Sequence, residues 1–260
     1  MTEAAHQIPI LMFHSISNGD GPTCITPEIF RAQMDMVSEA GWQVVSLDAV
    51  LDWHKGGTAL PEKAMAITFD DGFADFIENA HPVLEEKGFA NTMFVPTRND
   101  GGAEHWIGAA SPPRPLMTYS HLREIDQTQT MIAPHSRTHA DLTLLSPEER
   151  AGEISGAKAD FEDLLGRDMP HFAAPYGRVN EAVQRDIRAQ FDLAVGVTHG
   201  IAKAGDDLID LPRIEMFYYQ DLPRWQAFLD GRGGAYLASR QFIRRIRKFV
   251  RGLTPNKAGY

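Results

Sequence analysis

Residues Ala64 to Gly72 read AMAITFDDG and carry the strongest signal of the fold. A mostly apolar run that ends abruptly at a turn is typical of a buried strand in a parallel sheet. Successive strand residues point to opposite sides, so Asp70 and Asp71 are expected to have two different roles. Gly72 permits the tight turn that takes the chain off the strand. The structural alternative is a polar loop at the strand end, in which Asp71 or a neighbour caps the next helix.

Similar apolar runs recur along the chain. They occupy residues 8–13, 43–46, 92–95, 130–133, 172–174, 191–197 and 213–216. Between them, the periodicity predicts helices over residues 27–40, 75–87 and 147–165. Strands that alternate with helices predict an α/β fold with a parallel sheet. The number of strands favours a closed or nearly closed barrel with its site at the strands' C-terminal ends, and a doubly wound open sheet is the alternative.

A second polar motif, HSRTH at residues 135–139, also follows an apolar run. Two histidines at i and i+4 share one face of a helical turn, and this spacing suits one metal ion. With a carboxylate from the Asp-Asp pair, they make the ligand set of an open catalytic zinc-type site. Two unrelated surface histidines are the alternative.

A third motif, APYG at residues 174–177, follows the run at 172–174. Its turn can aim a backbone N–H into a pocket as an oxyanion donor, and a plain aromatic-bearing turn is the alternative. The Gly- and Pro-rich stretch 98–115 is too long for an ordinary connection and is expected to overhang the site. Of the four tryptophans, only Trp106 in this stretch has a place that favours substrate contact.

TFDDG at 68–72, HSRTH and APYG, in this order and spacing, resemble the polysaccharide deacetylase (NodB-homology) family, carbohydrate esterase family 4. The resemblance extends over about residues 8–230. It implies a distorted (β/α)7 barrel and a metal-dependent hydrolase that removes N-acetyl groups from a glycan.

The resemblance also implies roles for individual residues. Asp71, His135 and His139 would hold a divalent metal, most often zinc, with cobalt or nickel as substitutes. Asp70 would be the general base that takes a proton from the attacking water. The backbone N–H of Tyr176 would help to hold the oxyanion.

The chain departs from the family pattern at two places. The third motif often begins with an arginine that orients the base, and this position is Ala173 here. We hypothesise that Arg213, in LPRI at 211–214, supplies that guanidinium, and an ordinary surface arginine is the alternative.

The late Leu-x-His motif that usually donates the general acid is also missing. FHSI at 13–16 resembles the start of a circularly permuted branch in which this histidine comes from the N-terminal strand. His14 is therefore predicted to protonate the leaving amine, with His199 as the second candidate. The structural alternative is that His14 only satisfies hydrogen bonds at a strand end.

Charge divides the 260 residues into two parts. Residues 1–230 carry 17 Lys and Arg against 35 Asp and Glu, a formal charge of −18, whereas residues 231–260 carry eight Lys and Arg and no acid, +8. We expect a catalytic domain over 1–230 and a basic tail over 231–260. From Tyr236 on, the tail has the pattern of an amphipathic helix, which either lies on an anionic membrane or packs on the barrel. The net charge of −10 argues against nucleic acid as a partner.

The predicted activity is removal of N-acetyl groups from N-acetylhexosamine residues of a bacterial exopolysaccharide or its lipid-linked precursor. A deacylase or deformylase of a small amide or sugar-lipid, and an inactive glycan-binding barrel, are the alternatives. The single cysteine, Cys24, excludes an intrachain disulfide. The sequence shows neither a signal peptide nor an apolar run long enough to span a membrane, so a cytoplasmic protein is expected, free or peripheral at the inner membrane.

Overall fold

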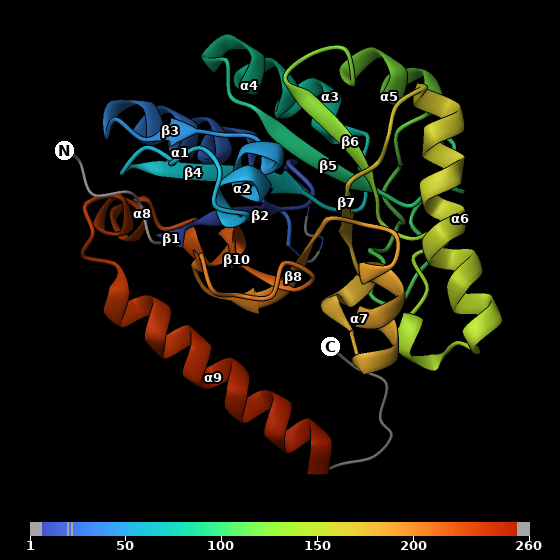
Figure 1. Cartoon of the computed structure of the whole chain (residues 1–260). Helices are drawn as coiled ribbons and strands as arrows, with labels where there is room; N and C mark the ends of the chain where they lie inside the picture. Colours follow the sequence, from blue (N-terminus) through green and yellow to red (C-terminus); the bar gives the residue numbers. More distant parts are fainter. Residues whose placement is uncertain (1–6, 20, 22, 254–260) are drawn as a thin grey trace.

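The computed structural model describes residues 7–19, 21 and 23–253, with side chains as far as residue 243. Seven parallel strands form a nearly closed barrel surrounded by helices (Figure 1). In chain order the barrel strands are β2 (Ile10–Phe13), β4 (Ala64–Phe69), β5 (Asn91–Val95), β6 (Thr130–Pro134), β7 (His171–Ala173), β8 (Leu193–His199) and β10 (Leu211–Glu215). The predicted barrel of alternating strands and helices is confirmed.

The strand order places the first strand beside the last one. Around the barrel the order is β6-β5-β4-β2-β10-β8-β7, so β2 lies between β4 and β10. No hydrogen-bonded ladder joins β6 to β7 within the part of the chain that the structure describes, and the barrel is open there. Short strands extend the sheets: β3 (Gln43–Val44) pairs with β4, and β1 (Gln7–Ile8) pairs antiparallel with β9 (Ala202–Lys203). The predicted strand at 8–13 is therefore two strands, separated by Pro9, which has no N–H for a ladder.

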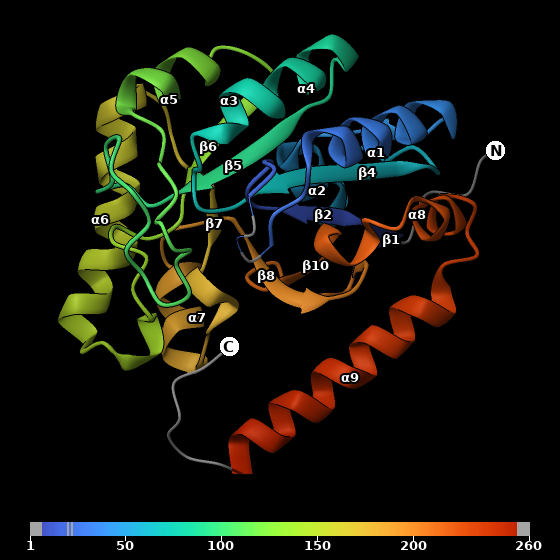
Figure 2. The ribbon, with the colours of Figure 1, turned by 180° about the vertical axis from the view of Figure 1, so that it is seen from behind.

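Helices cover the outside of the barrel, as the view from behind shows (Figure 2). They are α1 (Pro27–Glu39), α2 (Leu47–His54), α3 (Asp75–Asn79), α4 (His81–Lys87), α5 (Tyr119–Ile125), α6 (Pro147–Leu165), α7 (Glu181–Arg188) and α8 (Leu222–Leu229), and they are followed by α9 (Gly234–Leu253). The described residues also form the short 3-10 turns η1 (Leu142–Leu144), η2 (Pro175–Gly177) and η3 (Met216–Tyr219).

Two of these helices show how the sequence determines the boundaries. Helix α6 has the predicted bounds, and Ser146 caps it by accepting the Glu149 N–H. The prediction of one helix over 75–87 is wrong, since the chain breaks at Ala80 into α3 and α4. Pro82 has no N–H to donate to the helix before it, so α3 cannot continue through it.

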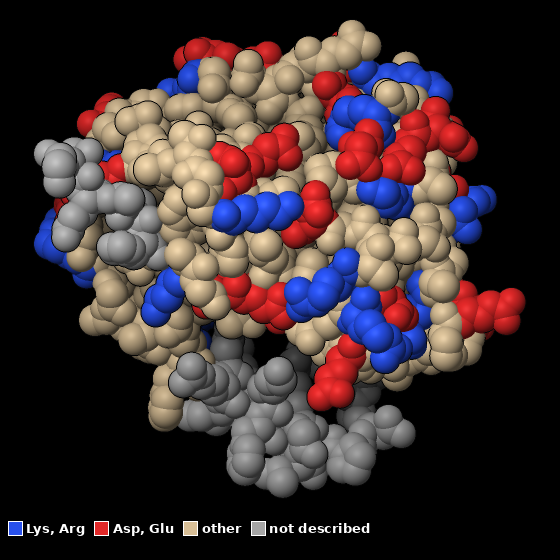
Figure 3. All heavy atoms as spheres, in the orientation of Figure 1, with Lys and Arg blue, Asp and Glu red and all other residues tan. Residues whose placement is uncertain are grey.

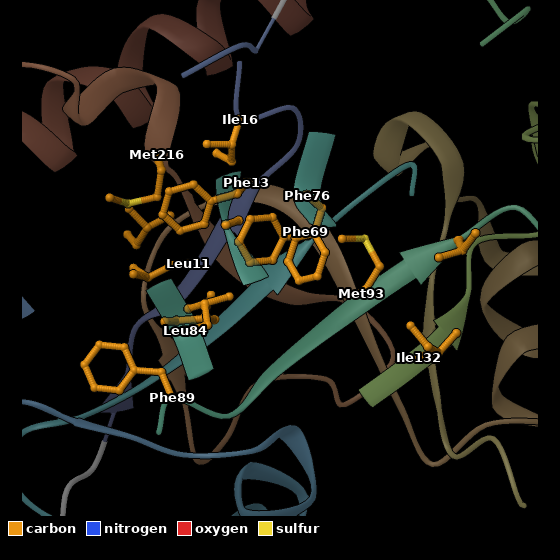
Figure 4. Close-up of a cluster of buried hydrophobic side chains, with 14 of the residues drawn as sticks. Leu11, Phe13, Ile16, Phe69, Phe76, Leu84, Phe89, Met93, Ile132 and Met216 are labelled. Atoms are coloured by element: carbon orange, nitrogen blue, oxygen red, sulfur yellow. The ribbon is translucent and has the colours of Figure 1, made fainter. Parts of the chain in front are cut away.

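An aromatic cluster beneath the C-terminal ends of β2 and β4 holds these two strands in register (Figure 4). The rings of Phe13 and Phe69 stack with centroids 5.2 Å apart, and Phe30 packs on both. Phe13 and Phe69 are also register partners. The residues that follow them, His14 and Asp70, therefore leave the barrel side by side.

Helix α9 starts against the barrel and then runs past it (Figure 1). Leu237 is buried, and the Arg240 guanidinium lies 3.6 Å from the centroid of the Tyr218 ring. One residue beyond Gln241, Phe242 is 63% exposed. Of the apolar stripe predicted for this helix, only Phe242 lies among the described side chains; Ile246, Phe249, Val250 and Leu253 lie outside them. None of the described helices is long and apolar enough to cross a membrane.

Candidate active site

The centre of the site is a buried carboxylate held by a buried arginine. Asp70 follows β4, and Arg213 lies on β10 with only 1% of its surface exposed. Its Nη1 and Nη2 donate to the two carboxylate oxygens of Asp70 at 2.7 Å each, a bidentate pair. Burial alone would raise the pKa of Asp70, but Arg213, assisted by the charges of His135 and His14, holds the pKa below its usual range. Asp70 is therefore ionised at neutral pH and fixed in orientation.

Arg213 is itself fixed from two further strands. Its Nε donates to the Gly196 carbonyl at 2.8 Å, and its Nη1 also donates to Thr68 Oγ1 at 3.0 Å. Thr68 in turn donates to the Leu11 carbonyl. The alternative of a surface arginine at position 213 is thus wrong. Thr68 belongs to the TFDDG motif, but no role was predicted for it, although a residue two before Asp70 on a strand points to the same side.

His14 is the third group beside Asp70. The Asp70 N–H donates to the Phe13 carbonyl at 2.9 Å, which brings residue 14 next to the carboxylate. The charge of His14 acts on the pKa of both Asp70 and Asp71. Its Nδ1 is buried and has no hydrogen-bond partner among the described residues.

His199, the second candidate acid, is engaged elsewhere. Its Nδ1 accepts the Glu215 N–H, and its ring lies edge-on to Tyr218. Neither Asp70 nor Asp71 has His199 among the main charges that shift its pKa. The geometry therefore favours His14 over His199 as the group next to the carboxylates.

Asp71 and the two histidines of HSRTH converge on one point. Asp71 Oδ1 lies 3.2 Å from His139 Nε2 and 3.5 Å from His135 Nε2. One donor atom from each of the three residues lies within 4.8 Å of the other two, and all three residues are buried. Two imidazole nitrogens and one carboxylate oxygen form the donor set of an open divalent-metal site.

The protonation of these groups also fits a metal. His135 Nδ1 donates to the Ala173 carbonyl at 2.8 Å across the open seam between β6 and β7, which leaves the Nε2 lone pair facing Asp71. Burial lowers the pKa of His135 to about 4. Burial would raise the pKa of Asp71, but the three histidines, His139 first, hold it well below its usual range. At neutral pH the ring is neutral and the carboxylate is ionised, which are the forms that bind a cation.

Backbone strain is concentrated at this site. Four of the five non-glycine residues with positive φ in the described chain belong to the three motifs: Asp71, Ser136, His139 and Tyr176. The expected helical turn over 135–139 is wrong, because the φ values of Ser136 (61°) and His139 (60°) are left-handed. Gly72 also has a positive φ, and a Cβ there would lie 2.8 Å from Val95 Cγ1. Such conformations persist only where the surroundings enforce them.

The rings of Trp106 and Tyr176 contact His139 from outside the metal-ligand set. Trp106 stacks on it with centroids 4.3 Å apart, and Tyr176 of η2 lies edge-on at 4.6 Å. The stretch 98–115 does overhang the site, as expected. It is fastened by Glu104, missed in the sequence, which accepts two bonds from the Arg114 guanidinium, at 2.7 and 2.9 Å.

Comparison with known proteins gives the family. The family profile described as Polysaccharide deacetylase matches residues 57–195. YxkH of Bacillus subtilis (strain 168), a protein named for the same family, is 26% identical over 216 residues, 83% of this chain and 73% of YxkH. The poly-β-1,6-N-acetyl-D-glucosamine N-deacetylase of Escherichia coli (strain K12) is 42% identical over a stretch of 55 residues, 21% of this chain and 8% of that enzyme.

A solved structure agrees over most of the barrel. The Streptococcus pyogenes deacetylase PplD in complex with acetate superposes with a TM-score of 0.71 at 26% identity, covering 80% of this chain and 91% of PplD. Residues 57–195, which the family profile matches, contain all three motifs. In the structure, the paired carboxylates and the two histidines of these motifs form one site at the end of the barrel. The chain belongs to the polysaccharide deacetylase family.

Proposed function

We propose that this polysaccharide deacetylase is a metal-dependent N-deacetylase of N-acetylhexosamine residues in a bacterial exopolysaccharide or its lipid-linked precursor. The observation that carries the proposal is the ionised Asp70, clamped by Arg213 directly beside the Asp71, His135 and His139 donor set. A barrel that only bound glycan would have no use for a buried, oriented carboxylate next to a metal site. The N-acetylglucosamine polymer named for the Escherichia coli relative supports the sugar class.

Asp71, His135 and His139 would hold the metal. A divalent cation there would acidify a water molecule and polarise the acetyl carbonyl. Asp70 then accepts the proton of the attacking water, while Arg213 keeps the carboxylate ionised and aimed. The new bond joins the water oxygen to the carbonyl carbon, and the Tyr176 N–H donates to the developing oxyanion.

His14 completes the reaction as the general acid. The C–N bond breaks as His14 gives a proton to the amide nitrogen, so that acetate and a free amine leave. An amine is a poor leaving group without this proton, and a positioned acid typically contributes about 10²–10⁴-fold. Trp106, stacked on His139, is in place to contact a sugar ring at the mouth of the site.

The test is acetate release from N-acetylglucosamine oligomers and from lipid-linked N-acetylated glycans. The wild-type chain loaded with zinc should release acetate, removal of the metal by a chelator should abolish it, and Asp70→Asn should lower kcat by about 10²-fold or more. Asp163→Asn, at an exposed position of α6, is the matched control and should match the wild type. Absence of release from every N-acetylated glycan, with release from a small amide instead, would overturn the assigned substrate class.

We further propose that residues 1–230 are the catalytic unit and that residues 231–260 bind an anionic membrane surface on the cytoplasmic side. The tail holds eight Lys and Arg and no acid. Phe242 and Ile243, where α9 leaves the barrel, are 63% and 38% exposed. On the face of the barrel shown in Figure 3, by contrast, charges of both signs are interspersed. A basic helix with an apolar stripe is favoured on anionic lipid.

A further inference from the structure

The segment that carries His135 and His139 has no regular structure of its own. Both Ser136 and His139 have left-handed φ values, and such conformations are strained for residues other than glycine. The His139 N–H donates to Ser136 Oγ at 3.0 Å, which closes the segment locally. Something outside the segment must hold this shape, since one local bond does not offset the strain.

Glu153 of α6 is placed to do so. Its Oε2 accepts the backbone N–H groups of both Arg137 and Thr138 at 2.9 Å, and its Oε1 accepts the Thr138 hydroxyl at 2.9 Å. Two successive amides that converge on one anionic oxygen form a backbone nest. These amides lie between the two histidines, so the carboxylate fixes the bend that turns both rings toward Asp71.

The same helix holds the side chain of Arg137. Asp160 accepts from its Nε and Nη2 at 2.9 Å each, and Asp160 also accepts the Thr97 hydroxyl. The guanidinium lies against Gly156, where a Cβ would be 2.4 Å from Arg137 Cζ. Glu153, Gly156 and Asp160 are spaced i, i+3 and i+7 and therefore share one face of α6.

We propose that Glu153 is a positioning residue for metal binding: through the Arg137 and Thr138 amides it sets the metal affinity of His135 and His139. The inference rests on the proposed metal-dependent function. Among the described residues, the three hydrogen bonds that Glu153 accepts come from this one segment, and none comes from its own helix. A residue that merely stabilised α6 would bond within the helix, as Glu149 does at the N-cap.

The experiment measures the zinc dissociation constant of the metal-free full chain by competition with a chelating dye. Glu153→Ala should bind zinc about 10–100-fold more weakly, the usual cost of losing an outer-shell partner. Glu153→Gln should lose only a few-fold, because its amide oxygen accepts the two N–H groups and its NH₂ donates to the Thr138 hydroxyl. Glu148→Ala, at an exposed position in the first turn of α6, is the matched control and should bind like the wild type.

A folded Glu153→Ala that binds zinc as tightly as Glu148→Ala would overturn the proposal. If Glu153→Ala does not fold, Thr138→Val is the deciding variant, because it removes one hydrogen-bond donor to Glu153 from an exposed side chain. A several-fold weaker zinc affinity of this variant supports the proposal, and an unchanged affinity overturns it. His139→Gln identifies the site by losing zinc binding. If the wild type binds zinc but releases no acetate, the proposed function is contradicted, whereas the effect of Glu153 on zinc affinity still holds.

Discussion

The pairing of Asp70 with Arg213 joins residues 143 positions apart in the sequence. Both partners are buried, and each carboxylate oxygen receives one guanidinium nitrogen at 2.7 Å. A lysine keeps the charge but cannot form the fork, so the carboxylate would be free to rotate. We expect Arg213→Lys to lower kcat by about 10²-fold, the cost of displacing a catalytic group by about 1 Å.

Steady-state kinetics on an N-acetylglucosamine oligomer measures this loss. Arg188→Lys is the control, because Arg188 is half-exposed and pairs with Asp207 at the surface, away from the carboxylate cluster. Wild-type kcat in Arg213→Lys would show that Asp70 does not need a bidentate partner.

His14 is tested by changing the leaving group. If His14 protonates the amine, His14→Gln should lose about 10²–10⁴-fold on an N-acetyl amide. It should lose little on an aryl acetate, because a phenolate leaves without a proton. His199→Gln serves as the control, since His199 Nδ1 is occupied by the Glu215 N–H. Equal losses on amide and ester would assign His14 a role other than that of the acid.

The residue types of the site were predictable, but their contacts were not. Asp71, His135 and His139 do converge, because parallel strands carry their C-terminal ends to one edge. Arg213 was only a hypothesis, since nothing in LPRI distinguishes a buried arginine from an exposed one. Its burial follows from the partners that surround it, and these come from distant strands.

At the scale of elements, α6 contains a natural pair of glycines for comparison. Gly152 has open space where a Cβ would lie, whereas the Cβ of an alanine at 156 would meet the Arg137 guanidinium. Gly152→Ala should therefore raise the free energy of unfolding by about 0.5–1 kcal/mol, the usual gain in a helix interior. Gly156→Ala should show no such gain, because Arg137 must leave Asp160.

Urea unfolding of the metal-free chain gives both values under one condition. An equal gain in the two variants would mean that the Arg137 side chain moves aside at no cost. The contact between α6 and the histidine segment would then be weaker than its geometry indicates.

Elements with strong local signals were predictable, and those shaped by tertiary contacts were not. Helix α6 has a Ser146 cap and Pro147 at its start, and its bounds agree with the prediction. The HSRTH segment has helical spacing in sequence, yet two of its residues have left-handed φ values, and Glu153 holds its backbone in that other shape. The acceptor that decides this shape lies on a neighbouring helix, where the period of the segment itself cannot reveal it.

At the scale of the whole molecule, the barrel and the tail carry opposite charge. The barrel strands bring every candidate catalytic residue to one edge, whereas α9 contributes none of them. Its first two turns pack on the barrel through Leu237 and Arg240, and the exposed Phe242 marks where that contact ends. A chain that ends at Gln241 should therefore keep the fold and the activity on soluble oligomers.

The same truncation should abolish binding to vesicles. It removes six of the eight Lys and Arg of the last 30 residues, each worth about 1 kcal/mol at an anionic surface. In sedimentation with phosphatidylglycerol vesicles, the full chain should bind at low salt and dissociate as the salt concentration rises. It should not bind vesicles of phosphatidylcholine. Vesicle binding that survives the truncation would place the contact on the barrel. A full chain that never binds, together with a lower melting temperature after truncation, would mean instead that the tail packs on the acidic body, because removal of packed apolar surface destabilises the fold.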